Sequence, residues 1–243
     1  MSFELLNSYL KVGKFLSITP PSIEIDKNSK FRQVHQVLMI LLIITCVMIS
    51  VYLRNFYLEY NLAKLTVCLL TDFALCAFCC RVIVEASKVL EWTELINGLQ
   101  NISYLLEENH NGNEKRIQWK FVLPQVIFCI NAIYISYFWF SIVGVLQLEQ
   151  YGFEILENYI QFFYTFYVYT ILEMILQRYE ALKLQVDNYK NLGQMGHSAC
   201  ILKDTVNRFN RIFGWSLLLL IAYTTLQFLN YLEYNLQSQE YGR

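Results

Sequence analysis

Residues 155–190 read ILENYIQFFYTFYVYTILEMILQRYEALKLQVDNYK, and this stretch decides the fold. The part up to Leu176 is apolar and aromatic, and it is long enough to cross a bilayer as a helix. The part from Gln177 onward is charged, yet apolar residues continue at helical spacing without a Gly or Pro. At about 1.5 Å per residue the stretch forms a rod of roughly 54 Å, whereas the hydrocarbon core of a bilayer is roughly 30 Å thick. The sequence therefore predicts a membrane helix with a long aqueous extension.

One face of this rod carries a continuous apolar stripe. Its members alternate four and three residues apart, and they run from the apolar part into the charged part. They are Val168, Leu172, Ile175, Tyr179, Leu182, Val186 and Tyr189. We expect this stripe to be the packing face of the helix, and we expect Gly193 to Gly196 to reverse the chain.

The composition fits a membrane protein with several spans. Of the 243 residues, 56% are hydrophobic and 16% are charged, and the formal net charge is −1. The balanced charge and the lack of a dense basic run give no support to a nucleic-acid partner. Cys76-x-x-Cys79 followed by Cys80 has metal-ligand spacing, but no His lies nearby, so we read these cysteines as small apolar residues. We therefore expect no metal and no cofactor.

Five apolar segments divide the chain into an N-terminal segment, residues 1–36, and a helical membrane domain, residues 37–243. The predicted spans are about 37–53, 65–84, 121–148, 155–176 and 212–232. We expect an N-terminal helix from Phe3 to Leu16, a second-span helix that continues beyond Glu85, and a final helix that starts near Ser198. A short acidic turn, Glu149 to Glu154, separates the third and fourth spans. The predicted fold class is all-α, with five transmembrane helices and long helical extensions.

The Lys and Arg residues predict the orientation in the membrane. Cytoplasmic connections are enriched in these residues. Fifteen lie in the N-terminal segment and in the connections that follow the second and fourth spans, against three on the other side, which are Arg54, Lys64 and Arg243. Arg81 lies inside a span and is expected to pair with Glu85, four residues on. We expect a multi-pass protein of the cell membrane with a cytoplasmic N-terminus, and all long helical extensions then lie in the cytosol.

The orientation also brings aromatic and polar side chains of several spans to the extracellular half of the membrane. An apolar cleft with a few polar groups between helices is the usual form of a small-molecule site. Our candidate ligand-binding residues are Tyr137, Tyr159, Phe163, Tyr223, Gln227 and Asp72. For any one of the aromatic residues, interfacial anchoring or helix packing is the simpler interpretation, since it needs no ligand. A carboxylate inside a span is costly, so we expect Asp72 to have a polar partner or to line a water-filled cleft.

The sequence contains no pattern typical of an enzyme. The three histidines, at positions 35, 110 and 197, are dispersed, and no phosphate-binding loop, nucleophile elbow or zinc-protease motif is present. A secondary transporter would have internal repeats and spans broken near their middle by Gly or Pro. The glycines of this chain lie outside the predicted spans or near their ends. We therefore expect a protein that is not an enzyme, and a transporter fragment is an alternative interpretation.

Two segments resemble the insect gustatory receptors, a family of the seven-span insect chemoreceptors. Residues 13–20, GKFLSITP, resemble the stretch that precedes the first span in that family. Residues 206–214, VNRFNRIFG, together with the long fourth helix and the glycine reversal, resemble the region between its fourth and fifth spans. The resemblance agrees with the cytoplasmic N-terminus. An odorant receptor of the same superfamily is the nearest alternative.

The chain departs from this family after the fifth span. Family members have a seventh span with a Thr-Tyr followed by Gln-Phe, and that span lines the cation pore of a tetramer. Gln227-Phe228 is present here, but no Thr-Tyr precedes it at the matching distance. We expect an N-terminal portion of such a receptor that stops before the pore helix. The resemblance implies a tastant-gated cation channel subunit that assembles with the same or related subunits, with the membrane lipid and a small tastant as its other partners.

Overall fold

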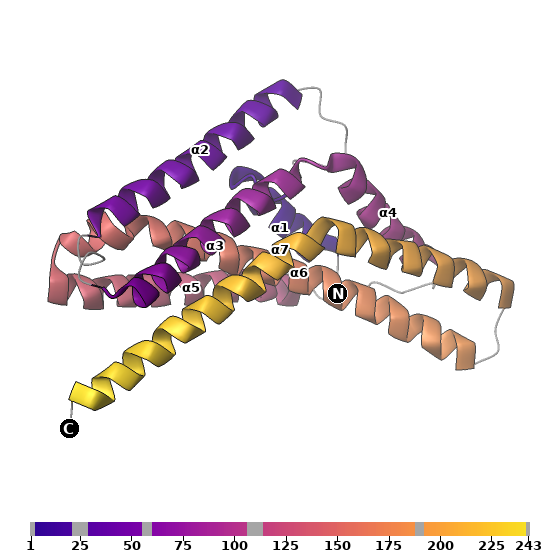
Figure 1. Ribbon diagram of the computed structural model, residues 1–243. Helices are drawn as coiled ribbons and strands as arrows, with labels where there is room; N and C mark the ends of the chain where they lie inside the picture. Colours follow the sequence, from indigo (N-terminus) through magenta and orange to yellow (C-terminus); the bar gives the residue numbers. More distant parts are fainter. Residues whose placement is uncertain (1–2, 21–28, 55–59, 106–113, 188–191, 242–243) are drawn as a thin grey trace.

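The computed structural model describes residues 3–20, 29–54, 60–105, 114–187 and 192–241. Within these ranges the chain forms seven helices and no strand (Figure 1). They are α1 (Phe3–Phe15), α2 (Ser29–Leu53), α3 (Leu62–Ala86), α4 (Val89–Leu105), α5 (Glu114–Val143), α6 (Leu146–Asp187) and α7 (Leu192–Tyr241). The all-helical fold class is confirmed.

Five of these helices are long and apolar enough to cross a membrane. Their apolar segments are Gln33–Leu53, Leu62–Ala86, Trp119–Ile142, Gln150–Leu184 and Met195–Leu232. Five apolar helices of sufficient length, in the predicted order along the chain, are therefore confirmed. None of the apolar segment of α5 is buried inside the molecule, and large apolar side chains such as Ile133 are exposed along it. A surface of this kind is suited to lipid or to another subunit.

The fourth predicted span belongs to a helix that is longer than the sequence indicated. Helix α6 has 42 residues and begins at Leu146, so the acidic turn predicted from Glu149 to Glu154 is wrong. The chain reverses instead at Gly144, whose φ is +73°, and the third span ends before the predicted Leu148. The amide of Gly144 donates to the Phe140 carbonyl at 2.9 Å and closes α5. A positive φ is costly for residues with a Cβ, which explains why the turn is located at this glycine.

The predicted continuation of the second-span helix beyond Glu85 is wrong, because α3 ends at Ala86 and α4 begins at Val89. The Ser87 hydroxyl donates to the Val84 carbonyl at 2.6 Å, and the Trp92 indole donates to the Glu85 carbonyl at 3.0 Å. These bonds satisfy carbonyls that a continuous helix would have used. The chain turns here and buries Trp92.

The glycine reversal is wrong as well, because α7 begins at Leu192 and Gly193 to Gly196 are already helical. Residues 188–191, between the end of α6 and Leu192, lie outside the described ranges. No heavy atom lies within 4 Å of a Cβ built on Gly196, so tight packing does not require this glycine. Two glycines cost a helix of 50 residues only about 1 kcal/mol each.

The buried face of α6 differs from the predicted stripe. Val168, Ile175 and Leu182 are buried, but Leu172 and Tyr179 are exposed. The buried residues of α6 are Glu157, Ile160, Phe163, Tyr164, Tyr167, Val168, Thr170, Ile171, Met174, Ile175, Arg178 and Leu182. Apolar side chains on a membrane helix face lipid as readily as they face a neighbouring helix, so hydrophobicity does not separate the two faces. The side chains of Val186 and Tyr189 lie outside the described residues.

Helix α1 confirms the helical periodicity predicted from Phe3, and it packs into the common core. The Tyr9 ring makes edge contacts with Phe121 of α5 at 4.8 Å and with Phe163 of α6 at 5.5 Å between ring centroids. Helix α1 contacts both α5 and α6. The N-terminal segment therefore shares its apolar core with the membrane domain instead of standing apart from it.

A compact cap ends α1 within the GKFLSITP stretch. Ser17 adopts a positive φ of 59°, its amide donates to the Lys14 carbonyl, and the Ile18 amide donates to the Gly13 carbonyl. This pattern is a Schellman cap, which normally has Gly where Ser17 stands. The Ser17 hydroxyl lies 2.7 Å from His35 Nδ1 and ties the cap to α2. A Cβ on Gly13 would approach Thr19 Cγ2 to 2.4 Å, so the cap requires glycine at that position.

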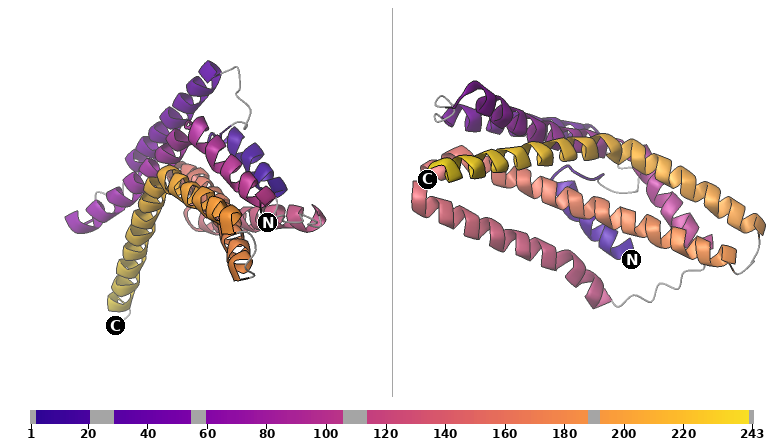
Figure 2. Two further views of the ribbon diagram at one scale, coloured as in Figure 1. Left: turned by 90° about the vertical axis from the view of Figure 1, so that its right-hand side faces the viewer. Right: turned by 60° about the horizontal axis from the view of Figure 1, so that its bottom comes forward.

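Helices α4, α6 and α7 pack together at one end of the molecule, and we call this region the α4–α6–α7 bundle. Trp92 of α4 makes an edge contact with Phe213 of α7 at 5.0 Å. Gly98 of α4 faces Thr205 of α7, and an ion pair joins Glu94 to Arg208. The opposite half of α7 diverges from α6 and projects from the molecule (Figures 1 and 2).

Candidate ligand-binding site

A buried arginine joins three helices at the end of α2. Arg54 follows the last residue of α2, and its side chain is only 6% exposed. Its Nη1 donates to both carboxylate oxygens of Asp72 on α3, at 3.0 and 2.9 Å. Its Nη2 donates to Glu154 Oε2 on α6 at 3.3 Å. The guanidinium thus joins the end of α2 to the middle of α3 and to the N-terminal part of α6.

The backbone around Arg54 is fixed by further hydrogen bonds. The Ser50 hydroxyl donates to the Gln150 carbonyl, and the Gln150 side-chain amide donates to the Leu53 carbonyl at 3.1 Å. The last carbonyls of a helix lack partners within it, so this amide caps α2. The Arg54 guanidinium also lies 4.4 Å from the centre of the Tyr151 ring, within the range of a cation–π contact. Arg54 is therefore held in a defined position.

The same three helices line a small pocket at this place. Its polar residues are Ser50, Arg54, Asp72, Glu154 and Glu157, and we call it the Arg54 pocket. Glu157 lies one turn after Glu154 on α6, is 7% exposed, and its Oε1 has no hydrogen-bond partner within the described ranges.

Asp72 has the polar partner that its position in a span led us to expect. That partner is Arg54, which the sequence had assigned to a solvated connection between the first two spans. Both Asp72 oxygens accept from Arg54 Nη1, which gives Asp72 a structural role in joining α2 to α3. Its role in ligand binding stays a prediction.

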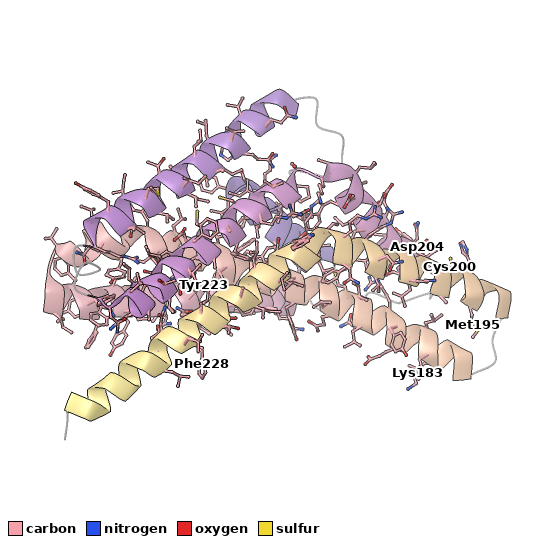
Figure 3. All side chains as sticks on the ribbon, in the orientation of Figure 1. Lys183, Met195, Cys200, Asp204, Tyr223 and Phe228 are labelled. Atoms are coloured by element: carbon pink, nitrogen blue, oxygen red, sulfur yellow. The ribbon has the colours of Figure 1, made fainter. Side chains whose placement is uncertain are left out.

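Tyr223 of α7 lies beside the Arg54 pocket. It is buried, and its hydroxyl lies 3.5 Å from Oδ1 of Asn158, the neighbour of Glu157 on α6. In Figure 3 Tyr223 lies between α7 and α3, which run alongside each other there. Gln227 is half-buried one turn further along α7. One turn beyond Gln227, the Asn230 amide donates to the Thr71 hydroxyl at 3.0 Å and joins α7 to α3.

Tyr159 and Phe163 lie on a different side of α6. The Tyr159 hydroxyl and Gln125 Oε1 of α5 are 3.0 Å apart, with Tyr159 as the donor, and the Tyr159 ring lies 5.3 Å from the Phe128 ring. Phe163 is fully buried against Tyr9. These contacts account for both residues as packing between α1, α5 and α6.

Tyr137 is separate from the other candidates. It lies on α5 and its side chain is 72% exposed. The structure therefore brings Asp72, Tyr223 and Gln227 to one region, places Tyr159 and Phe163 in another, and leaves Tyr137 on the surface. The six residues do not line a single cleft.

Sequence reasoning missed Arg54, Glu154 and Glu157 as members of the pocket. A signal was present, since Glu154 and Glu157 are three residues apart and therefore lie on the same side of a helix that is otherwise apolar there. The sequence analysis assigned Glu154 to a turn, so Glu154 and Glu157 were not placed on the same helix. A buried arginine on α6 was also missed, and it lies in the α4–α6–α7 bundle.

That residue is Arg178, which is completely buried. Its Nε donates to the Leu99 carbonyl at 3.0 Å, its Nη1 to the Met174 carbonyl at 2.7 Å, and its Nη2 to the Ser103 hydroxyl at 2.7 Å. It fastens α6 to the last turns of α4. Arg178 follows Met174 by four residues and therefore lies on the same face of the helix. This spacing was the signal in the sequence that could have predicted its burial.

A second charged group lies at the end of α3. Glu85 is buried and pairs with Arg81, as predicted, and with Lys88 at 2.7 Å. Among the residues that the structure describes, no three His, Cys, Asp or Glu side chains lie close enough together to hold a metal ion. Comparison with protein-family models, curated proteins and solved structures gives no match to this chain.

Proposed function

We propose that this chain is a gustatory-receptor-like membrane protein, a subunit of a cation channel that opens when a small tastant binds. One observation carries the proposal: α6 runs unbroken from the Arg54 pocket to the α4–α6–α7 bundle. At about 1.5 Å per residue its 42 residues span roughly 63 Å, about twice the thickness of the hydrocarbon core. A single rigid helix therefore joins a candidate sensing region to a candidate assembly region.

The Lys and Arg distribution supports an orientation for this helix. It favours a cytoplasmic N-terminus, which puts the bundle in the cytosol and the Arg54 pocket at the extracellular ends of α2 and α6. In the gustatory receptors, which the chain resembles, cytoplasmic helix ends hold four subunits together. We infer the same use for the bundle, with the exposed apolar face of α5 in contact with lipid or with a related subunit.

The proposed mechanism follows from the way in which α6 joins the Arg54 pocket to the α4–α6–α7 bundle. A ligand can shift a conformational equilibrium only by its different affinity for the two states. Binding among Asp72, Tyr223 and Gln227 would favour one relative position of α3, α6 and α7. The change would reach the bundle through α6 and α7, and the resemblance implies that a pore-lining helix beyond the fifth span responds to it.

The proposal is tested by recording from cells that express this chain together with subunits of the insect gustatory receptor family. Sugars, bitter compounds, amino acids and amines are applied in turn, and surface expression is verified by biotinylation. We expect a dose-dependent cation current that cells with the partner subunits alone do not produce. Surface expression with currents identical to those of the partners alone would contradict the proposal.

A further inference from the structure

The Arg54 pocket is a closely packed cluster of charged side chains with no room inside it for an organic ligand. Its cavity volume is about 10 Å³, roughly the space that one water molecule needs. Among the described residues that line it, Arg54 is the only cation, and Asp72, Glu154 and Glu157 contribute three carboxyl groups. If all three carboxyl groups were ionised, the cluster would carry a formal charge of −2.

Arg54 compensates only two of these carboxyl groups. Its Nη1 lies 2.9 Å from Asp72 Oδ2, and its Nη2 lies 3.3 Å from Glu154 Oε2. Glu157 is 7% exposed, and its Oε1 is buried without a hydrogen-bond partner among the described residues. Neither a described cation nor bulk water therefore compensates a negative charge on this oxygen.

The other groups around Glu157 do not supply a positive charge either. The thiols near it are those of Cys46 on α2 and of Cys76, Cys79 and Cys80 on α3. The phenol of Tyr223 on α7 reaches Asn158, the next residue of α6. Thiols and phenols are ordinarily neutral at pH 7, so the charged neighbours of Glu157 are Arg54 and the two carboxylates that Arg54 already binds.

These surroundings make an ionised Glu157 very unfavourable. A carboxylate that is buried without a partner costs so much free energy that such a group normally takes up a proton instead. The negative charges of Asp72 and Glu154 act in the same direction, because like charges disfavour ionisation. The described acidic side chains and cysteines do not form a group that could hold a metal ion, so a metal does not replace the proton there.

We propose that the Arg54 pocket is a proton-binding site, in which Glu157 is a neutral carboxylic acid at neutral pH. The bound proton changes the formal charge of the cluster from −2 to −1. Loss of the proton adds an uncompensated negative charge beside Asp72 and Glu154 and weakens the junction of α2, α3 and α6. That the proton comes from the extracellular side rests on the proposed function, whereas proton binding itself does not.

The direct test is infrared spectroscopy of the purified full chain at neutral pH, in nanodiscs of ether-linked lipids, which lack ester carbonyls. A neutral carboxyl group has a C=O stretching band separate from the bands of a carboxylate. Ordinary Asp and Glu side chains, with pKa values of about 4, are ionised at this pH and do not contribute to it. We expect the band in the unaltered protein and its loss in Glu157→Gln. Glu173→Gln is the matched control, because it removes a half-buried Glu side chain of the same helix outside the pocket, and it should leave the band unchanged.

A pH titration of the same band tests the origin of the effect. Asp72→Asn removes one negative neighbour and releases part of the Arg54 guanidinium for Glu157. An opposite charge favours ionisation, so the band of this variant should disappear at a pH about one unit lower than in the unaltered protein.

Stability gives an independent measurement. In the unfolded chain Glu157 ionises at an ordinary value of about 4.3, whereas in the folded protein it stays neutral, so the unfolded state is favoured as the pH rises. Relative to Glu157→Gln, the folding equilibrium constant of the unaltered protein should fall about tenfold per pH unit from about pH 5 to neutral pH. Thermal unfolding of the two proteins over this range measures the difference.

Identical infrared spectra of the unaltered protein and Glu157→Gln at neutral pH would overturn the proposal, and so would a stability difference that does not change with pH. If Glu157→Gln does not fold, the titration of Asp72→Asn decides, and loss of the band at the same pH as in the unaltered protein would overturn the proposal. Absence of tastant currents with the Glu157 band present would contradict only the proposed function. Tastant currents without the Glu157 band would contradict only the proton site.

Discussion

Two buried guanidinium groups organise the molecule at the scale of single residues. Arg54 neutralises carboxylates from two other helices, and Arg178 donates to carbonyl and hydroxyl oxygens of α4 and α6. Hydrogen bonds from charged donors are about twice as strong as neutral ones, and their geometry is more specific. Each arginine therefore fixes how neighbouring helices lie against each other, at opposite ends of the buried face of α6.

Replacing Arg178 by Met should destabilise the protein strongly. The substitution retains most of the side-chain volume but leaves the Leu99 carbonyl and the Ser103 hydroxyl without their donor. We expect a loss of about 2–4 kcal/mol, visible as a lower thermal unfolding temperature in detergent. Arg211→Met is the control, because Arg211 is exposed on α7, and it should change the stability by less than about 0.5 kcal/mol. Equal unfolding temperatures for the two variants would contradict the role of Arg178.

Tyr9 gives a prediction for alkaline pH. Its burial raises its pKa from the ordinary value of 10.0 to about 12, and the Thr170 side chain offsets part of that rise. Between pH 10 and pH 12 the phenol ionises in the unfolded chain but not in the folded protein, so stability falls as the pH rises through this window. Tyr9→Phe removes the effect. The difference in unfolding temperature between the two proteins should be constant below pH 10 and should move in favour of Tyr9→Phe above it; a constant difference up to pH 12 would refute the prediction.

At the scale of residues, the sequence showed which side chain requires a polar partner, but it did not show which residue supplies that partner. It identified Asp72 as a carboxylate that requires a polar group, since a charge inside a span is costly. It could not identify Arg54 as that group, because a residue at the end of a span is equally suited to solvent. The burial of Arg178 was not predicted for a related reason. A charged residue at an apolar position of a helix is normally assumed to face solvent and to interrupt the apolar face.

At the scale of helices, the structure depends on where each helix ends and on how closely two helices approach. The end of α5 requires the positive φ of Gly144, and the end of α3 uses the Ser87 hydroxyl. The closest described approach to a glycine between two helices is at Gly98, where a Cβ would lie 2.5 Å from Thr205 Oγ1. This contact sets the distance between α4 and α7.

Gly98→Ala should therefore destabilise the α4–α6–α7 bundle. Alanine favours the helix by up to about 1 kcal/mol, but the added methyl group overlaps Thr205, and overpacking of this kind costs about 1–3 kcal/mol. We expect a net decrease in the thermal unfolding temperature. Gly214→Ala on α7 is the matched control, because no heavy atom lies within 4 Å of its Cβ position, and it should leave the stability unchanged or raise it.

A second substitution tests the cause. Thr205→Ala in the Gly98→Ala background removes the overlapping hydroxyl, which donates only to the Ile201 carbonyl of its own helix. The double variant should recover at least half of the lost stability. Failure of the double variant to recover any stability would show that the contact with Thr205 does not determine the effect of Gly98→Ala.

The sequence predicted the existence and order of the helices well but not their ends. Long apolar segments dominate the hydropathy pattern, so the five spans and α1 were clear. The ends depend on single contacts across the fold, such as the Trp92 indole on the Glu85 carbonyl, which no local pattern contains. The glycines at 193 and 196 were misleading because a helix as long as α7 tolerates them.

At the scale of the whole molecule, α6 and α7 extend side by side from the bundle and then separate. Lys183 lies near the end of α6 and Met195 near the start of α7, and Cys200 and Asp204 lie on the following turns of α7 (Figure 3). At the other end, the Arg54 pocket joins α2, α3 and α6. The proposed function assigns these two ends to opposite sides of the membrane, the bundle inside and the pocket outside.

The most direct test of this central claim is the labelling of two cysteine positions in intact cells with a membrane-impermeant maleimide. Cys200 is exposed on α7 at the bundle, and Leu62 is exposed at the start of α3 on the pocket side, so Leu62→Cys is introduced into a Cys200→Ser background. The proposed orientation predicts that Leu62→Cys is labelled in intact cells, and that Cys200 of the unaltered chain is labelled only after permeabilisation. Labelling of Cys200 in intact cells, with Leu62→Cys protected until permeabilisation, would contradict it.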